Sequence, residues 1–188
     1  MSRATSPEIP AATRTWVLEL LDLHERSLVA FATRITGDLE RARDVVQETF
    51  LELLRAEHSA VEERARQWLF TVTRNRALDA LRKEQPMQSH DPSAAPILDQ
   101  RLTEEQGPAE AAQHADTLAQ IQGLLTSLPE NQREVLELKF HHGLSYSEIA
   151  GVTQHSIGHV GWLIHHGLKT LRRRLGVDQV SGAAEGLA

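Results

Sequence analysis

The sequence has 188 residues, which is enough for one medium domain or two small ones. Hydrophobic residues make up 40% and charged residues 24%, as in ordinary soluble globular proteins, and the lack of Cys excludes disulfides and thiolate metal sites. The formal net charge of −6 disfavours a protein that simply coats nucleic acid, and no signal-peptide pattern or apolar run of about 18 residues is present, so we expect a cytoplasmic protein without a membrane span.

The predicted fold class is all-α, because Gly and Pro are sparse inside the periodic segments and no run alternates as a strand does. A first helix is predicted over 15–35. Gly37 then ends it, and Asp38 caps a second helix over 39–55. The second helix has an apolar stripe at helical spacing. The stripe consists of Ala42, Val45, Val46, Thr49, Phe50, Leu53 and Leu54.

A polar loop over 56–63 leads into a third helix over 64–84. We expect the core face of this helix to be formed by Trp68, Leu69, Val72 and Leu81. The segment is also strongly basic, although the chain as a whole is acidic. Its charged residues between 64 and 83 are Arg64, Arg66, Arg74, Arg76, Asp79, Arg82 and Lys83.

The composition changes after the third helix. Residues 85–110 are rich in Pro and acidic side chains and lack helical periodicity, which predicts a flexible linker. Two small helical domains are therefore expected, over 15–84 and 111–176, followed by a short polar tail over 177–188.

The second predicted domain ends in a helix-turn-helix. Helices over 111–127 and 130–141 are followed by Ser145, which with Glu148 forms a capping box for a short helix over 146–151. A turn then leads to a last helix over 157–175, whose inner stripe is Val160, Ile164, Leu168, Leu171 and Leu175. Such a pair places its second helix in the major groove of DNA.

Three further patterns allow both a functional and a structural interpretation. The face of the second helix opposite its stripe is either a solvated surface or a docking surface for another protein. The basic third helix interleaves cations with aromatic side chains, as binding of unstacked nucleic acid requires, but Trp68 at helical spacing is also typical of a core residue. Gly161 and Gly167, costly inside a helix, suggest close approach of DNA or another protein helix, with Trp162 as the anchor.

The order of these parts identifies a family resemblance. The strings GDLERARDVVQETFLELL, WLFTVTRNRALDALRK and LPENQREVLELKFHHGLSYSEIA, with an acidic linker between the second and third, resemble the extracytoplasmic-function (ECF) sigma factors of RNA polymerase. The resemblance implies sigma domain 2 as a helical bundle and sigma domain 4 as the helix-turn-helix. It implies a protein that binds core RNA polymerase, through the clamp of the largest subunit and the flap of the second-largest. It also implies recognition and opening of promoter DNA, with an anti-sigma factor as a further partner.

The resemblance also suggests roles for individual residues. The docking helix for core polymerase is represented by Asp44, Gln47, Glu48 and Leu51. The −10 element would be bound beside the loop over 56–65 by Arg74, Asn75, Arg76, Asp79 and Arg82. For the −35 element the candidates are Ser156, His159, Trp162, His165, Lys169, Arg172 and Arg173.

The last helix departs from the family pattern. Family members usually have Arg and Lys through the middle of this helix, whereas here cations begin only at Lys169. The helix therefore either reads DNA through Ser156, His159, Trp162 and His165, or binds something else, such as a regulator.

Enzymatic activity, cofactors and a metal site are not expected. The chain has ten His, but adjacent pairs point to different sides of a helix, and no nucleophile–base–orienter set or phosphate-binding glycine loop is evident. The main alternative to a sigma factor is a helix-turn-helix transcriptional regulator that acts without being a polymerase subunit.

Overall fold

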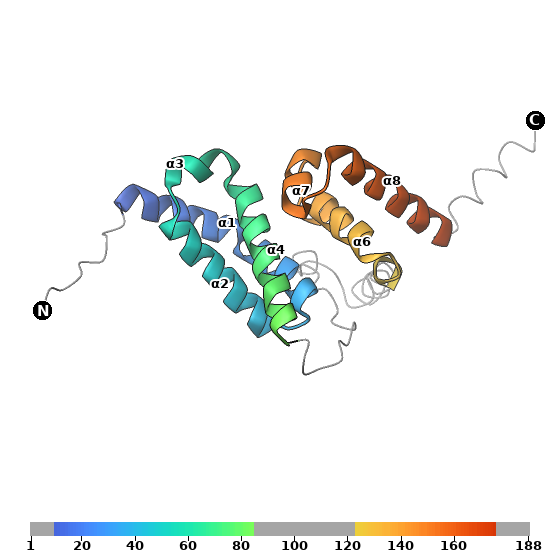
Figure 1. The fold of residues 1–188 in the computed structure, drawn as a ribbon, viewed down its shortest axis with the longest axis horizontal. Helices are drawn as coiled ribbons and strands as arrows, with labels where there is room; N and C mark the ends of the chain where they lie inside the picture. Colours follow the sequence, from blue (N-terminus) through green and yellow to red (C-terminus); the bar gives the residue numbers. More distant parts are fainter. Residues whose placement is uncertain (1–9, 85–122, 176–188) are drawn as a thin grey trace, which may run out of the picture. The chain divides into compact units, whose positions relative to one another are not determined.

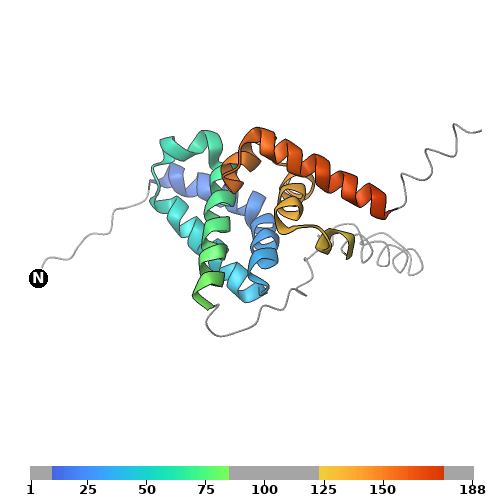
Figure 2. The ribbon, with the colours of Figure 1, turned by 45° about the vertical axis from the view of Figure 1, so that its right-hand side comes forward.

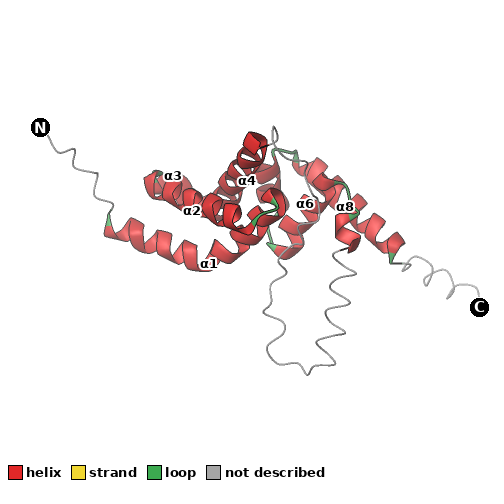
Figure 3. Cartoon of the chain, turned by 90° about the horizontal axis from the view of Figure 1, so that it is seen from below, coloured by secondary structure: helices red, strands yellow, loops and turns green. Residues whose placement is uncertain are grey.

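The structure is a computed structural model and describes residues 10–84 and 123–175 (Figure 1). These residues form two compact units, one in each range, and each unit is described by itself. The predicted all-α class is confirmed, since both described ranges contain helices and loops and no strand (Figure 3). The predicted linker over 85–110 and the tail over 177–188 lie outside the described residues.

The first unit is built around two helices with a sharp connection. Helix α1 (Ala11–Thr36) ends at Gly37, whose φ of 71° is a left-handed conformation that Gly adopts at little cost. Asp38 then accepts a hydrogen bond from the backbone N–H of Arg41 at 2.8 Å and begins α2 (Leu39–Arg55). The predicted second helix has the bounds of α2, because both of its ends are set by local caps.

The segment predicted as a loop over 56–63 is partly helical. It contains the short helix α3 (His58–Val61) and the turn η1 (Glu62–Arg64), which lead into α4 (Ala65–Glu84). Val61 is buried and anchors the segment to the unit, which is why it is more ordered than its polar composition suggested.

Helices α1, α2 and α4 pack against one another in a three-helix bundle (Figures 1 and 2). Phe31 of α1 and Phe70 of α4 meet edge to face, with ring centroids 5.4 Å apart, and both are fully buried. The predicted core face of α4 was wrong in part, because Trp68, Val72 and Leu81 are only half-buried. The buried positions of α4 are Ala65, Leu69, Phe70, Thr73 and Ala77. Helix α4 packs against both α1 and α2, and several of its buried side chains are small or polar. A search for large apolar residues at helical spacing therefore misses these positions.

The second unit consists of α6 (Glu130–Leu136), the π-helical turn η3 (Glu137–His141), α7 (Tyr146–Thr153) and α8 (Ile157–Arg174), preceded by a helical end over 123–126. The predicted capping box is confirmed, since Ser145 and Glu148 each accept a hydrogen bond from the other's backbone N–H.

Helices α7 and α8 form the predicted helix-turn-helix, and α8 packs on both α6 and α7. Ser156 accepts a hydrogen bond from the backbone N–H of His159 at 3.2 Å and caps α8. The inner side of α8 consists of Val160, Leu163, Ile164 and Gly167. The predicted inner stripe was wrong at Leu175, which is 56% exposed and lies just beyond the end of the helix.

Candidate nucleic-acid and protein interfaces

The face of α2 opposite the core is a polar surface with one apolar residue. Asp44, Gln47 and Glu48 are exposed, as predicted, and Leu51 is 44% exposed beside them. An exposed Leu among acidic and amide side chains supplies both apolar area and hydrogen-bonding groups. We refer to Asp44, Gln47, Glu48 and Leu51 as the docking face.

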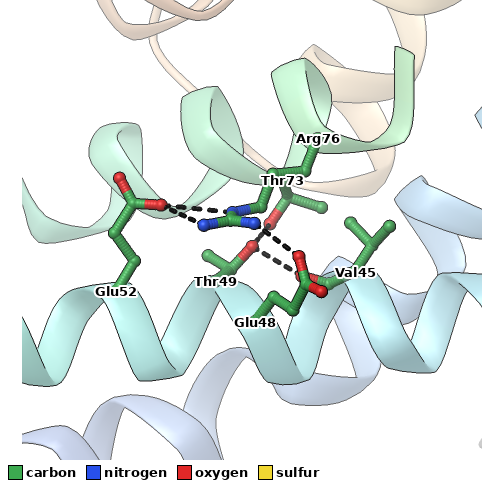
Figure 4. Close-up of polar contacts among 6 residues, drawn as sticks. All are labelled: Val45, Glu48, Thr49, Glu52, Thr73 and Arg76. Carbon is green, nitrogen blue, oxygen red and sulfur yellow. Dashed lines mark hydrogen bonds and ion pairs between the residues drawn. The ribbon is translucent and has the colours of Figure 1, made fainter. Parts of the chain in front are cut away.

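One member of the docking face is held by α4. The guanidinium of Arg76 donates to Glu48 at 2.5 Å and to Glu52 at 2.5 and 3.1 Å (Figure 4). Beneath this bridge, the buried hydroxyl of Thr73 bonds that of Thr49 at 3.3 Å. The bridge therefore joins the two helices that were assigned to different partners.

Sequence reasoning missed Glu52, which lies one turn from Glu48 on the side of α2 facing α4. The spacing of the two carboxylates at i and i+4 was visible in the sequence, but their common partner lies 24 residues beyond Glu52.

The remaining −10 candidates on α4 differ in their exposure and in their side-chain partners. Asn75 is exposed, Arg74 is half-buried, and Asp79 pairs with Arg82 at 3.2 Å on the surface. The half-exposed Trp68 is neither a full core residue nor a free aromatic platform. Asn75, whose amide can pair with a base edge, is thus exposed on this helix.

All of the −35 candidates are exposed on α8 or at its cap. They are Ser156, His159, Trp162, His165, Lys169, Arg172 and Arg173. No acidic side chain occurs between Ile157 and Arg174. The cations gather in the C-terminal part of the helix, while its N-terminal part carries aromatic rings.

These rings contact one another in series, which the sequence analysis did not predict. His155 meets His159 edge to face at 4.8 Å between centroids, and His159 and Trp162 are stacked within 7° at 5.7 Å. Trp162 stacks in turn on His166 at 4.1 Å. The i, i+3 and i, i+4 spacing of these residues was a visible signal for this contact. We call His155, His159, Trp162 and His166 the ring ladder.

Gly161 and Gly167, two of the three glycines of α8, differ in their surroundings. A Cβ at Gly167 would lie 2.8 Å from Cδ1 of the buried Leu136, so a larger side chain would force Leu136 to shift where α8 packs on α6. A Cβ at Gly161 would lie 3.7 Å from the ring of Tyr146, an ordinary contact. Close approach of a protein helix, one of the two predicted alternatives, is thus found at Gly167, where the helix is α6 of the same unit.

The histidines of the second unit show no metal site. His142 is buried, with Nε2 at 3.6 Å from Oε1 of Glu137. Within 10–84 and 123–175, no three His, Asp or Glu side chains are grouped as metal ligands would be. No helix in those two ranges is long and apolar enough to cross a membrane.

Comparison with protein families matches both halves of the chain. The model of Sigma-70 region 2 matches residues 20–86, and that of Sigma-70 region 4 matches residues 118–171. The ECF RNA polymerase sigma factor SigL of Mycobacterium tuberculosis is 34% identical over 170 residues, covering 88% of this chain and 92% of SigL. SigW of Bacillus subtilis is 24% identical over 163 residues, covering 84% of this chain and 87% of SigW.

Solved structures show the same fold. CnrH, determined in complex with the cytosolic domain of CnrY, has a TM-score of 0.59 at 24% identity and covers 88% of this chain and 90% of its own. The sigma factor RpoE of Bartonella quintana, determined with the anti-sigma factor NepR, has a TM-score of 0.55 at 22% identity, with coverage of 86% and 97%.

The alternative of a helix-turn-helix regulator is not favoured, because it leaves the region 2 match without a role. The chain belongs to the ECF family of RNA polymerase sigma factors, the subunits that bind core polymerase and direct it to promoter DNA.

Proposed function

We propose that two adjacent helices of the first unit bind different partners. Helix α2 would bind core polymerase, and helix α4 would bind the −10 element. The docking face of α2 would bind the clamp of the largest polymerase subunit. The exposed Asn75, with Arg74, Asp79 and Arg82, would contact the non-template strand beside the segment over 56–65. The observation that carries this proposal is the contact of α2 with α4 through Arg76, which keeps the two surfaces adjacent but distinct.

For the second unit we propose binding of the −35 element by α8. Its charge supports this, because a helix without acidic side chains and with Lys169, Arg172 and Arg173 near its end is attracted to phosphates. In a helix-turn-helix the N-terminal part of the second helix meets base edges. The flap of the second-largest polymerase subunit would hold this unit in place.

The decisive experiment is transcription with purified components. Core polymerase from the host is combined with the full-length chain and genomic fragments, and the 5′ ends of the transcripts are mapped. We expect starts at a small set of promoters and none from core polymerase alone. A chain that acts only in the presence of another sigma factor would instead be a regulator.

The docking face is tested with a double variant, Asp44→Ala with Gln47→Ala. Both residues are exposed, so helical circular dichroism should be unchanged while affinity for core polymerase falls at least tenfold, that is by about 1.4 kcal/mol or more. The matched control is Glu19→Ala with Asp22→Ala, an exposed pair on α1, which should bind core polymerase normally. Equal binding by both double variants would remove the role of the docking face.

We also propose a protein inhibitor as a further partner and the cytoplasm as the place of action. Support for an inhibitor comes from the two solved structures of this fold, each of which contains a partner protein. A chain purified from its host at low salt should carry a protein that lowers its affinity for core polymerase. If host-derived and recombinant chains bind core polymerase equally well, no such inhibitor is bound.

A further inference from the structure

We infer that the ring ladder of α8 reads thymine in the −35 element, with Trp162 as the residue that contacts the thymine methyl group. This inference rests on the proposed function of α8 and names the chemistry by which it selects a sequence.

The ring ladder lies on the exposed side of the N-terminal part of α8 and just before it. Its rings extend from His155, just before the cap, to His166, whereas the inner side of α8 is occupied by Val160, Leu163, Ile164 and Gly167. Trp162 is 50% exposed, a large area for an apolar ring in a small domain. The ladder thus occupies the part of a recognition helix that enters the major groove.

The ring ladder is already ordered in the chain without DNA. Trp162 lies between His159 and His166 and stacks on both. Nδ1 of His166 donates to the backbone carbonyl of Trp162 at 2.9 Å, which fixes one end of the stack. Rings that are already ordered lose little rotamer freedom on binding, so more of the contact energy appears as affinity.

The groups that each base presents in the major groove differ in the side chains that contact them. Guanine is read most often by Arg or Lys, which bond O6 and N7 together, but no cation occurs in α8 before Lys169. Thymine is the base that presents a methyl group in the major groove, and apolar side chains contact it. The exposed, largely apolar ring of Trp162 matches a methyl group, which neither donates nor accepts a hydrogen bond.

The cations of α8 lie apart from the ring ladder along the helix. Lys169, Arg172 and Arg173 follow the ladder and would lie toward the phosphates when the rings lie in the groove. Phosphate contacts strengthen binding to every sequence, and each adds roughly 0.9 to the logarithmic salt slope. The ladder would therefore determine which duplex is chosen, and the cations how tightly any duplex is held.

The test replaces single thymines by uracil, which removes only the methyl group. Holoenzyme reconstituted from host core polymerase and the full chain is bound to promoter duplexes found by the transcription experiment. Each thymine of the −35 element is replaced in turn. At one or two positions we expect binding to weaken about fourfold, since a buried methyl group contributes about 0.8 kcal/mol and 1.4 kcal/mol is a factor of ten.

The same duplexes are then bound by variants of the chain. Trp162→Ala should bind the thymine duplex about as weakly as the wild type binds the uracil duplex, and uracil should cost it nothing further. Trp162→Phe keeps a ring and should keep the sensitivity to uracil. Lys169→Ala is the matched control on the same helix, and should weaken binding to both duplexes equally while lowering the salt slope by about 0.9.

The outcomes separate the inference from the function on which it rests. If wild-type holoenzyme tolerates uracil at every position, or if Trp162→Ala remains as sensitive as the wild type, the inference is wrong although promoter-specific transcription persists. If no promoter-specific transcription occurs at all, the proposed function itself fails. Hydrogen exchange of the α8 amides checks that Trp162→Ala is folded. If Trp162→Ala is unfolded, the uracil sensitivity of Trp162→Phe decides instead, and its loss would contradict the inference.

Discussion

Arg76 donates to one carboxylate oxygen of Glu52 from two of its nitrogens, at 3.1 and 2.5 Å. Their side chains are 32% and 44% exposed, so water screens the pair only in part. A planar guanidinium that donates two hydrogen bonds to a carboxylate on another helix favours a measurable coupling free energy between the two residues.

We predict a coupling free energy of about 0.5–1 kcal/mol between Arg76 and Glu52. It is measured by a double-mutant cycle of Arg76→Met and Glu52→Gln in urea denaturation. A Trp162→Phe background leaves Trp16 and Trp68 as reporters of the first unit alone. The pair Glu40 and Arg43, 79% and 59% exposed, is the control and should couple more weakly. A coupling no larger than that of the control would show that the bridge does not stabilise the unit.

Opening of the promoter should depend on Asn75 more than polymerase binding does. Asn75 is exposed on α4, so Asn75→Ala should leave the fold and the affinity for core polymerase intact. The permanganate reactivity of melted thymines around the −10 element reports open complexes and should fall. The docking-face variant Asp44→Ala with Gln47→Ala should show the opposite order of effects. If polymerase binding and opening fall in parallel in Asn75→Ala, Asn75 is structural.

Replacing the glycines of α8 by Ala should have opposite effects at two positions. Gly167→Ala forces a methyl group to 2.8 Å from Cδ1 of the buried Leu136, so we predict a net loss of about 1–3 kcal/mol in unfolding free energy. Gly158→Ala meets nothing within 4 Å and should gain up to about 1 kcal/mol from helix propensity. Hydrogen exchange of the α6 and α8 amides measures both. Stabilisation by Gly167→Ala would mean that Leu136 moves aside at no cost.

The stability of the first unit should fall in mild acid because of His24. Burial, and secondarily the charge of Arg66, hold the pKa of His24 below its ordinary value of 6.5. As the pH falls, His24 therefore takes up a proton in the unfolded chain before it does so in the folded chain. The contribution of neutral His24 to the unfolding free energy is complete above pH 6.5. It is lost as the pH falls from 6.5 to the pKa of His24 in the folded chain.

The measurement for His24 is the urea midpoint of the first unit at pH 7.5 and in steps below 6.5. His24→Gln should flatten the dependence in this window, and Arg66→Gln should reduce it in part by removing the second cause. An unchanged profile in His24→Gln would assign the pH dependence to other groups.

What the sequence predicted well is what local chemistry determines. The end of α1 and the start of α2 follow from Gly37 and Asp38, and the start of α7 follows from Ser145 and Glu148, all of which act within one helical turn. The exposure of the docking face followed from the apolar stripe on the other side of the same helix.

What it could not predict depends on residues far apart in the chain. The core face of α4 was misjudged because Thr73 and Ala77 are buried by α1 and α2, and neither is conspicuously apolar. The prediction left open whether DNA or a protein helix approaches Gly167, because its neighbour, Leu136, lies on another helix. The bridge from Arg76 to Glu48 was missed for the same reason.

That bridge has a consequence for redesign of the protein. Glu48 lies on the surface proposed to meet polymerase, while Arg76 lies on the helix proposed to meet melted DNA. Substituting Glu48 to suit the polymerase of another bacterium would leave Arg76 with Glu52 alone and change the support of α4. An engineer transplanting this subunit between hosts should therefore vary Glu48 and Arg76 together, and select for promoter choice as well as for assembly.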